Sequence, residues 1–335
     1  MERETDTLAK ESPVRLSSIQ TIISDRLEAV QEDISRIIVS DFGIIQEVNE
    51  CLLAMKGKLF RPTLVLLANE IDQEPSDDAV TLGAIVELIH LATLVHDDAV
   101  DHSVLRRGLP TVNAMWTHQV AVIMGDYLYS RSVRELVQMK KFSALSLLAN
   151  AANQMSIGEM RQLTSVDALS FTERDYNRLI ECKTASLISA ACEIGAMERN
   201  EHHSKPLADF GYNLGMAFQI ADDLLDYKGE ESVIGKPSGQ DLREHKVTLP
   251  LVASLNNMSE VELKETRKFF TLVEPTDVDI QKMVEIVREN GGLDYAESQA
   301  DKYAERAKEI LWTLPSGPAS KALENAVTYT VTRDR

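Results

Sequence analysis

The chain has 335 residues, of which 53 are acidic and 35 basic, so its formal net charge is −18 and nucleic acid is disfavoured as its main partner. Any anionic ligand must therefore bind in a local basic pocket. Its three cysteines, Cys51, Cys182 and Cys192, are widely spaced and form no CxxC pair, which excludes a disulfide framework and a cysteine zinc site and favours a reducing cytoplasm.

Residues 1–16 are expected to form a flexible N-terminal extension. The stretch MERETDTLAKESPVRLSS lacks a basic segment followed by an apolar one, so we expect neither a secretory nor an organellar leader. The apolar stretch TLGAIVELIHLATLV is shorter than the roughly 20 residues that span a bilayer, and it contains Glu87 and His90. These features predict a cytoplasmic protein with no integral membrane segment.

Apolar residues recur at intervals of three and four along most of the chain, which predicts an all-α fold. The expected helices cover residues 17–55, 61–73, 78–101, 112–139, 142–164, 172–198, 205–227, 247–256, 259–271, 278–290 and 293–313. The SGP sequence at 316–318 is expected to break the last long element. No proline-, glycine- and serine-rich linker divides the chain, so residues 1–335 are predicted to form one domain. The long stretch 228–246 has no helical period, and loops of this length inside compact domains are usually functional.

A first acidic triplet lies in HDDAVDHSVLRRG, at the end of the expected helix 78–101. On a helix Asp97 and Asp101, four residues apart, share one face, and Asp98 lies about 100° round on the flank. Two arginines, Arg106 and Arg107, follow closely. A single triplet of this kind is as compatible with a solvated acidic turn as with a metal site.

A second acidic triplet, in FQIADDLLDYKG, favours the metal site over the solvated acidic turn. Asp222, Asp223 and Asp226 have the same spacing and again end an apolar helical run. Helix C-termini already carry partial negative charge, so two such triplets predict a site rich in cations. Ligation by carboxylates alone points to Mg²⁺, or to Mn²⁺, with the remaining ligands supplied by water and by substrate phosphates.

Basic residues accompany the acidic triplets, and together they suggest clamps for diphosphate groups. Each alone is equally compatible with a surface cation; the set is Lys58 and Arg61 in KGKLFRP, Lys183 in ECKTASLISAA, and Lys236 and Lys246 at the loop 228–246. The glycines of that loop do not form a phosphate-binding Walker A motif, because five residues instead of four separate Gly229 from Gly235 and a proline follows Lys236.

These blocks, in the order GKLFRP, DDAVDHSVLRRG, CKTASL, FQIADDLLDYKG and GKPSGQDLREHKVTLPL, make the chain resemble the trans-isoprenyl (polyprenyl) diphosphate synthases, most of all long-chain members such as octaprenyl diphosphate synthase. The resemblance covers nearly the whole chain. It implies an all-α, isoprenoid-synthase-type bundle around a deep central cavity, with the two aspartate motifs facing each other across its mouth, and a homodimer.

The resemblance also implies a role for each matching residue. Asp97, Asp101 and Asp222, assisted by Asp98, Asp223 and Asp226, would hold three Mg²⁺ ions on an allylic diphosphate. Arg106, Lys183, Lys236 and Gln219 would contact that diphosphate, whereas Lys58, Arg61, His90 and Arg107 would hold the diphosphate of isopentenyl diphosphate. Thr184 and Lys246 match positions that line the reacting centre. Lys56 and His245 depart from the family pattern, since both stand where glycine is usual.

The implied reaction is the head-to-tail condensation of isopentenyl diphosphate with an allylic prenyl diphosphate to a long all-trans product. Small residues, Ala92 and Thr93, stand where bulky aromatic residues would stop the growing chain. A stop elsewhere, at Met124, Tyr127 or Tyr129, would instead give a farnesyl or geranylgeranyl product. Three alternatives are a terpene cyclase of the same fold, a regulatory subunit without activity, and a plain helical scaffold. The complete second triplet and the second set of cations argue against all three.

Overall fold

The structure is a computed structural model, and it describes residues 14–55, 57–72, 75–106, 108–164, 169–198, 201–228 and 239–332. Its elements are the helices α1 (Leu16–Gln20), α2 (Ser24–Ile37), α3 (Gly43–Ala54), α4 (Phe60–Asn69), α5 (Asp78–Val100), α6 (Val112–Met115), α7 (His118–Gln138), α8 (Phe142–Thr164), α9 (Glu173–Ile180), α10 (Ser186–Met197), α11 (Glu201–Lys228), α13 (Gln240–Arg243), α14 (Leu249–Leu255), α15 (Glu260–Phe269), α16 (Asp277–Glu289), α17 (Gly292–Leu311) and α18 (Pro318–Thr332), the 3₁₀ turn η1 (Thr21–Ile23), the π-helical turn η2 (Glu181–Ala185) and the strands β1 (Leu105–Arg106) and β2 (Leu109–Pro110). The expected all-α fold is confirmed, and the two strands form a single short antiparallel hairpin within the described part of the chain.

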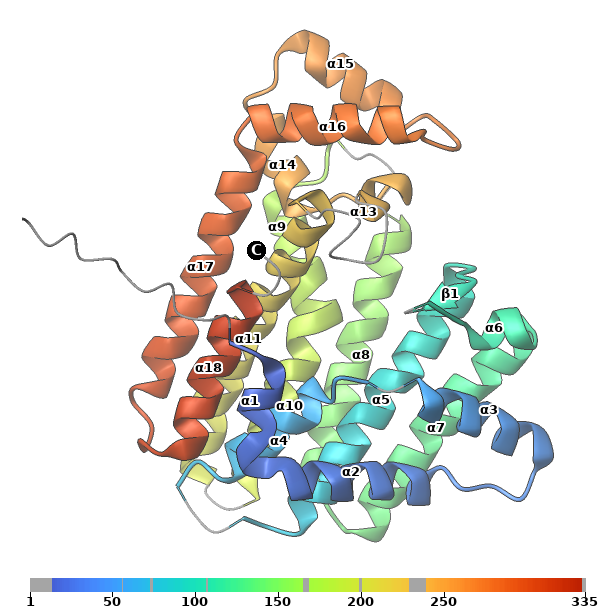
Figure 1. The fold of residues 1–335 in the computed structure, drawn as a ribbon, viewed down its shortest axis with the longest axis vertical. Helices are drawn as coiled ribbons and strands as arrows, with labels where there is room; N and C mark the ends of the chain where they lie inside the picture. Colours follow the sequence, from blue (N-terminus) through green and yellow to red (C-terminus); the bar gives the residue numbers. More distant parts are fainter. Residues whose placement is uncertain are drawn as a thin grey trace, which may run out of the picture.

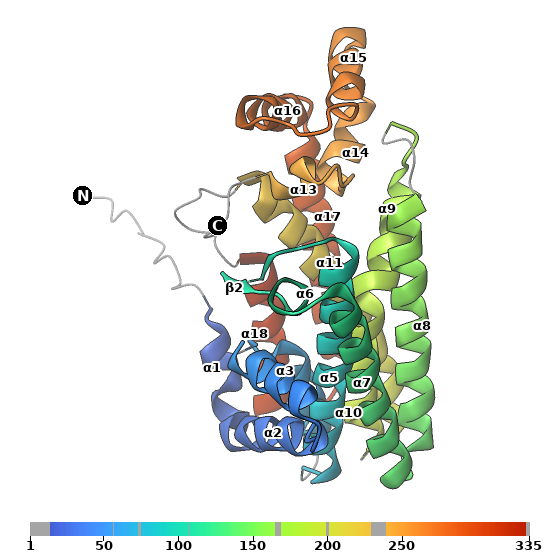
Figure 2. The ribbon, with the colours of Figure 1, turned by 90° about the vertical axis from the view of Figure 1, so that its right-hand side faces the viewer.

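The long helices α5, α7, α8, α10, α11 and α17 run roughly along the longest axis of the molecule (Figure 1). Helix α2 crosses one end of this bundle and α3 follows it, α1 lies beside α18, and α15 and α16 lie beyond the other end (Figures 1 and 2). Helix starts have local causes: Thr172, Ser259 and Thr276 each form a capping box, which satisfies free amide groups in the first turn of α9, α15 and α16.

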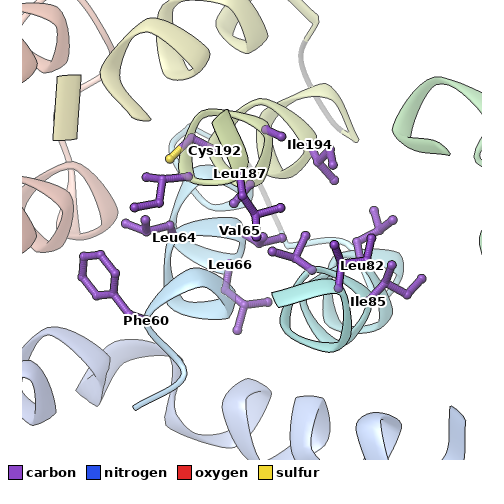
Figure 3. Close-up of a cluster of buried hydrophobic side chains, with 14 of the residues drawn as sticks. Phe60, Leu64, Val65, Leu66, Leu82, Ile85, Leu187, Cys192 and Ile194 are labelled. Atoms are coloured by element: carbon purple, nitrogen blue, oxygen red, sulfur yellow. The ribbon is translucent and has the colours of Figure 1, made fainter. Parts of the chain in front are cut away.

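The main core lies where α4, α5 and α10 meet. Figure 3 shows Val65 of α4 between Leu82 and Ile85 of α5 and Leu187 of α10, with Leu64 on the side of Phe60. Helix α5 is long and apolar enough to cross a membrane, but 56% of its most apolar window is buried inside the protein, as in the core helix of a soluble protein. A second core joins α9, the end of α11, α14, α16 and α17.

Two glycines let helices touch through their backbones. A Cβ atom on Gly195 of α10 would lie 2.2 Å from the Val65 carbonyl oxygen of α4, and one on Gly215 of α11 would lie 2.6 Å from Ala185 Cα in η2. No side chain fits at such distances. Consequently, α10 packs closely on α4, and α11 packs closely on the π-helical turn.

Three expectations about the elements were wrong. Residues 17–55 form α1, η1, α2 and α3 rather than one helix, because the chain breaks after α2, where the Ser40 hydroxyl accepts a hydrogen bond from the Phe42 amide. The segment 172–198 is interrupted by η2. The expected helix 112–139 is divided into α6 and α7 at Trp116 and Thr117. The predicted break at 316–318 is confirmed, since α17 ends at Leu311, but the chain continues in α18, a helix that the sequence did not predict, with Pro318 at its first position, where its missing N–H is not needed. The expected extension 1–16 falls mostly on residues outside the described part, although Leu16 already belongs to α1.

Candidate active site

The first acidic triplet lies at the C-terminal end of α5, where Asp101 caps the helix. Asp98 is buried, and its two carboxylate oxygens accept hydrogen bonds from Arg106 Nε at 2.8 Å and Arg106 Nη2 at 2.9 Å. This bidentate geometry is the strong form of an arginine–carboxylate pair. Asp98 therefore points at the hairpin and away from the face that Asp97 and Asp101 share, as the helical spacing predicts.

The hairpin that follows α5 holds Arg106 in place. Arg106 pairs with Leu109 across the two strands, and Gly108 takes the left-handed conformation that closes the turn, with φ +77°. The Thr111 hydroxyl donates to the Ser103 carbonyl at 2.6 Å and ties the two ends of the hairpin together. Arg107, expected at the second diphosphate, lies outside the described residues.

Asp97 lies in an environment that opposes its negative charge. Burial raises the pKa of Asp97 to about 6, and the nearby carboxylates Glu159 and Asp101 add to this, while Lys183 and Arg106 act in the opposite direction. A carboxylate in this state gains stability from any added cation.

Lys183 projects from the π-helical turn η2, a type of distortion that is frequent at functional sites. Its Nζ donates to Glu159 Oε2 at 2.7 Å and to Gln162 Oε1 at 3.1 Å, both on α8. The other oxygen, Glu159 Oε1, is buried and accepts no hydrogen bond from the described residues. Glu159 and Gln162 were not anticipated from the sequence, because neither belongs to a charged motif.

The second triplet lies near the C-terminal end of α11, and Asp223 is its most buried member, at 5% exposure. Asp223 accepts hydrogen bonds from the Tyr176 hydroxyl at 2.5 Å and from Gln219 Nε2 at 2.8 Å. The Thr184 hydroxyl in turn donates to Gln219 Oε1 at 2.7 Å. Burial, followed by repulsion from Asp241, raises the pKa of Asp223 well above its ordinary value. Tyr176 was not anticipated from the sequence.

Asp226 caps the short helix α13. Its carboxylate accepts hydrogen bonds from the amides of Gln240 at 3.0 Å and Asp241 at 2.9 Å, yet burial still raises its pKa. Asp241 lies beside it, and burial together with Asp226 raises the pKa of Asp241 to about 7. Asp241 belongs to the GQDLREHK stretch of the family pattern, but the sequence alone did not place it in the site.

Lys246 connects the two triplets. Burial would lower the pKa of Lys246, but an ion pair with Glu244 at 2.5 Å and the charges of Asp241 and Asp101 raise it. Asp241 adjoins the second triplet and Asp101 belongs to the first, so the ammonium group of Lys246 interacts electrostatically with carboxylates at both triplets. The structure thus brings residues of both triplets to one site with Lys183, Arg106 and Lys246; Lys236 lies outside the described residues.

The residues expected at the second diphosphate come from α4, α5 and the segment before α4. Lys58 is exposed beside a surface groove of about 870 Å³, and its Nζ lies 3.5 Å from the Tyr329 hydroxyl. Arg61, in the first turn of α4, and His90, two turns before Asp97 on α5, are both partly buried.

The residues of the site fit a hard divalent cation that is shared with an anionic ligand. Burial is the main cause of the raised pKa values of Asp97, Asp226 and Asp241, and neighbouring carboxylates add to it, so the ligand-free site disfavours the charged form of each of these carboxylates. Within the described ranges no three histidine, cysteine, aspartate or glutamate side chains converge enough to hold an ion by themselves. Such a set matches Mg²⁺, which keeps several waters and completes its coordination with phosphate oxygens.

The candidate chain-length residues differ in environment. Thr93 shares the Asp97 face of α5, is partly buried and donates to the His90 carbonyl at 2.7 Å, whereas Ala92 is packed in the core at 3% exposure. On α7, Met124 is buried, and the Tyr127 hydroxyl lies 3.0 Å from the Ile38 carbonyl beyond the end of α2. Tyr129 is only partly buried and packs against the main core.

His245 accounts for one departure from the family pattern. Its backbone is left-handed, with φ 55°, a conformation that glycine adopts without strain. The imidazole ring packs against Phe269 and Phe270, with centroids 5.8 Å and 5.7 Å away. A glycine would suit this turn, and histidine is accommodated by ring packing. Lys56, the other departure, lies outside the described residues.

Comparisons with known proteins agree with this geometry. Residues 43–287 match the polyprenyl synthetase family. The chain is 34% identical to heptaprenyl diphosphate synthase component 2 of Geobacillus stearothermophilus, over 96% of this chain and 100% of the relative, and 32% identical to octaprenyl diphosphate synthase of Escherichia coli over the same shares. A crystal structure of a polyprenyl synthase from Caulobacter crescentus, complexed with calcium and isoprenyl diphosphate, superposes with a TM-score of 0.90 at 34% identity, covering 97% of this chain and 100% of that one.

Proposed function

Since the chain belongs to the polyprenyl synthetase family, whose members are prenyltransferases, we propose that it condenses isopentenyl diphosphate with an allylic prenyl diphosphate and repeats this step to a long all-trans product. The observation that carries the proposal is the meeting of both acidic triplets with Lys183, Arg106 and Lys246 in one site. A terpene cyclase has no need for a second diphosphate site, and a silent subunit has no need for two complete triplets.

The basic side chains of the site fall into two groups, each of which binds one of the two diphosphates, and the aspartates hold the metal ions. Lys183 and Arg106, with Gln219, bind the allylic diphosphate; Lys183 then exchanges its Glu159 partner for a phosphate oxygen. Lys58, Arg61, His90 and Arg107 bind the second diphosphate. Mg²⁺, and in its place Mn²⁺, when held by Asp97, Asp101 and Asp222, supplies positive charge that stabilises the departing diphosphate, with three ions expected in the site. The fixed cations of the chain contribute in the same way because they are preorganised.

The chemistry requires no protein nucleophile. The allylic C–O bond breaks and its electron pair leaves with the diphosphate; the double bond of isopentenyl diphosphate then forms the new C–C bond, and a proton passes to the released pyrophosphate. The apolar residues of α5 exclude water that would quench the cation. The partly buried Thr93 on the Asp97 face supports a long product, because a small side chain there leaves the growing chain its path along α5.

The test is product analysis with purified protein, Mg²⁺, farnesyl diphosphate and labelled isopentenyl diphosphate. We expect one long polyprenyl diphosphate by mass, lost with a chelator and with Asp97→Ala. Asp209→Ala, which changes an exposed carboxylate on α11 far from the site, is the matched control. A product no longer than geranylgeranyl diphosphate would contradict only the proposed long chain length of the product. Absence of elongation with every allylic primer would refute the proposed prenyltransferase activity.

We propose further that the chain forms a homodimer through the outer faces of α7 and α8, which lie side by side (Figure 2). Residues 142–158 of α8 contain no charged side chain, although the chain as a whole is highly charged. On α7, Val122 and Ile123 are exposed, and Phe142 follows at the start of α8. An uncharged face of this length suits a second copy of itself better than water.

Light scattering after size exclusion tests the dimer. We expect Ile123→Arg to give a monomer, and Val278→Arg, which charges an exposed apolar position on α16, to leave the dimer intact. A wild-type monomer would refute the homodimer and direct attention to a second chain, since one relative is named a component of its enzyme. The three free cysteines support a cytoplasmic location.

A further inference from the structure

A chain of hydrogen bonds leads from the interior to the reacting centre. It begins at Tyr176 on α9, passes through Asp223 and Gln219 on α11, and ends at Thr184 in the π-helical turn, with donor–acceptor distances of 2.5, 2.8 and 2.7 Å. Tyr176 and Asp223 are 1% and 5% exposed and Thr184 is also buried, whereas Gln219 is partly buried. At the Tyr176–Asp223 end of the chain, water therefore cannot replace a partner that is lost.

The chemistry of the donors fixes the direction of every bond. The Tyr176 hydroxyl donates to one Asp223 oxygen and the Gln219 amide nitrogen donates to the other, so the amide nitrogen of Gln219 is turned toward Asp223. The carbonyl oxygen of Gln219 then faces Thr184 and takes the only proton of that hydroxyl. Thr184 is left with lone pairs alone for any further neighbour.

We propose that Tyr176 is a positioning residue: together with Asp223 it locks the Gln219 amide, so that the Thr184 hydroxyl offers the reacting centre a lone pair rather than a proton. This inference rests on the proposed function, in which an allylic carbon becomes electron-poor. A hydroxyl that presents its oxygen stabilises such a carbon, and one that presents its hydrogen opposes it. Asp223 thereby acts inside the protein, in contrast to Asp222.

Tyr176→Phe removes the hydroxyl and keeps the ring. We expect kcat to fall about tenfold to a hundredfold, the range typical of lost supporting contacts around a metal site, while KM for both substrates stays within about threefold. The half-saturating Mg²⁺ concentration should not move. Tyr295→Phe is the matched control, because Tyr295 donates to a carboxylate of the same helix α9, Glu173, at 2.8 Å but on the protein surface.

Asp223→Asn gives a second, independent prediction. An asparagine amide has one acceptor oxygen where Asp223 has two, so it can accept from Tyr176 or from Gln219 but not from both, and the lock on the Gln219 amide is lost in either case. We expect the same loss of kcat with an unchanged Mg²⁺ requirement. A rise in that requirement with Asp223→Asn alone would show that Asp223 is a metal ligand and would overturn the positioning role.

Binding separates positioning from misfolding. With Mg²⁺ and the unreactive thio analogue of farnesyl diphosphate, calorimetry should give wild-type affinity for Tyr176→Phe within about threefold. Wild-type kcat in Tyr176→Phe, or a loss of analogue affinity parallel to the loss of rate, would refute the inference. An inactive wild-type enzyme would refute the proposed function itself, which is a distinguishable result.

Discussion

Replacing Asp97 by asparagine is expected to stabilise the ligand-free protein while it abolishes activity. Asp97 is held in a buried position beside Glu159 and Asp101, and this environment raises its pKa from 3.8 to about 6. Asparagine keeps the volume and removes the charge. In the ligand-free protein the ionised Asp97 carboxylate therefore lowers the free energy of unfolding, and a bound cation would offset this cost.

The sign and size of the effect follow from the shift in pKa. Because the folded-state pKa is raised, the unfolded chain releases the proton first, and stability is lost as the pH rises from about 4 through about 6. A shift from 3.8 to about 6 corresponds to about 3 kcal/mol at pH 8, at 1.36 kcal/mol per pKa unit, and to about half of that at pH 5. Asp97→Asn escapes this loss at every pH.

Urea unfolding of the ligand-free protein at pH 5 and pH 8 measures the difference. The control is Asp33→Asn, since hydrogen bonds from Arg36 and Thr81 outweigh burial and lower the pKa of Asp33. This variant should be destabilised at both pH values. Added Mg²⁺ should stabilise the wild type at pH 8 more than Asp97→Asn. Two results would contradict the burial of an uncompensated charge at Asp97. In one, Asp97→Asn is no more stable than the wild type at pH 8; in the other, its gain in free energy of unfolding is the same at pH 5 as at pH 8.

Four further substitutions test the site. Thr93→Phe should shorten the product, as measured by mass, whereas Ala92→Phe should lower stability by about 1–3 kcal/mol in urea because it overpacks the core. Arg106→Lys cannot make both bonds to Asp98, and kcat/KM should fall about tenfold to a hundredfold, the equivalent of one charged hydrogen bond. Asp226→Ala leaves two amides of α13 without an acceptor, and urea unfolding should show a loss of about 1–3 kcal/mol.

The helical class and most helix positions were predictable because apolar spacing and caps are local properties of the chain. Where the prediction failed, a competing local interaction decided the outcome. The Ser40 hydroxyl takes part in the break after α2, and Pro318 starts a helix where proline more often ends one. Periodicity also cannot detect the π-helical turn, since its pattern of apolar residues stays helical on both sides.

The charged motifs of the site were predictable because an aspartate spacing that occurs twice, each time with cations nearby, rarely arises on a merely solvated surface. The sequence could not distinguish the roles within each triplet. Asp98 and Asp223 are turned into the protein by Arg106 and Tyr176, partners on other elements that only the fold brings near. Glu159 could not be predicted for the same reason, since its role depends on a contact between α8 and Lys183 of η2, which are separate elements of the chain.

The close contact between Gly215 and Ala185 sets the spacing of functional groups that lie on two separate elements. It fixes the register between α11, which carries Gln219 and Asp222, and the turn that carries Lys183 and Thr184. A Cβ atom on Gly215 would lie 2.6 Å from Ala185 Cα and 3.0 Å from Ala185 Cβ, so a larger residue there would push the turn away from α11. The shape of the site thus depends on a glycine that has no side chain to take part in its chemistry.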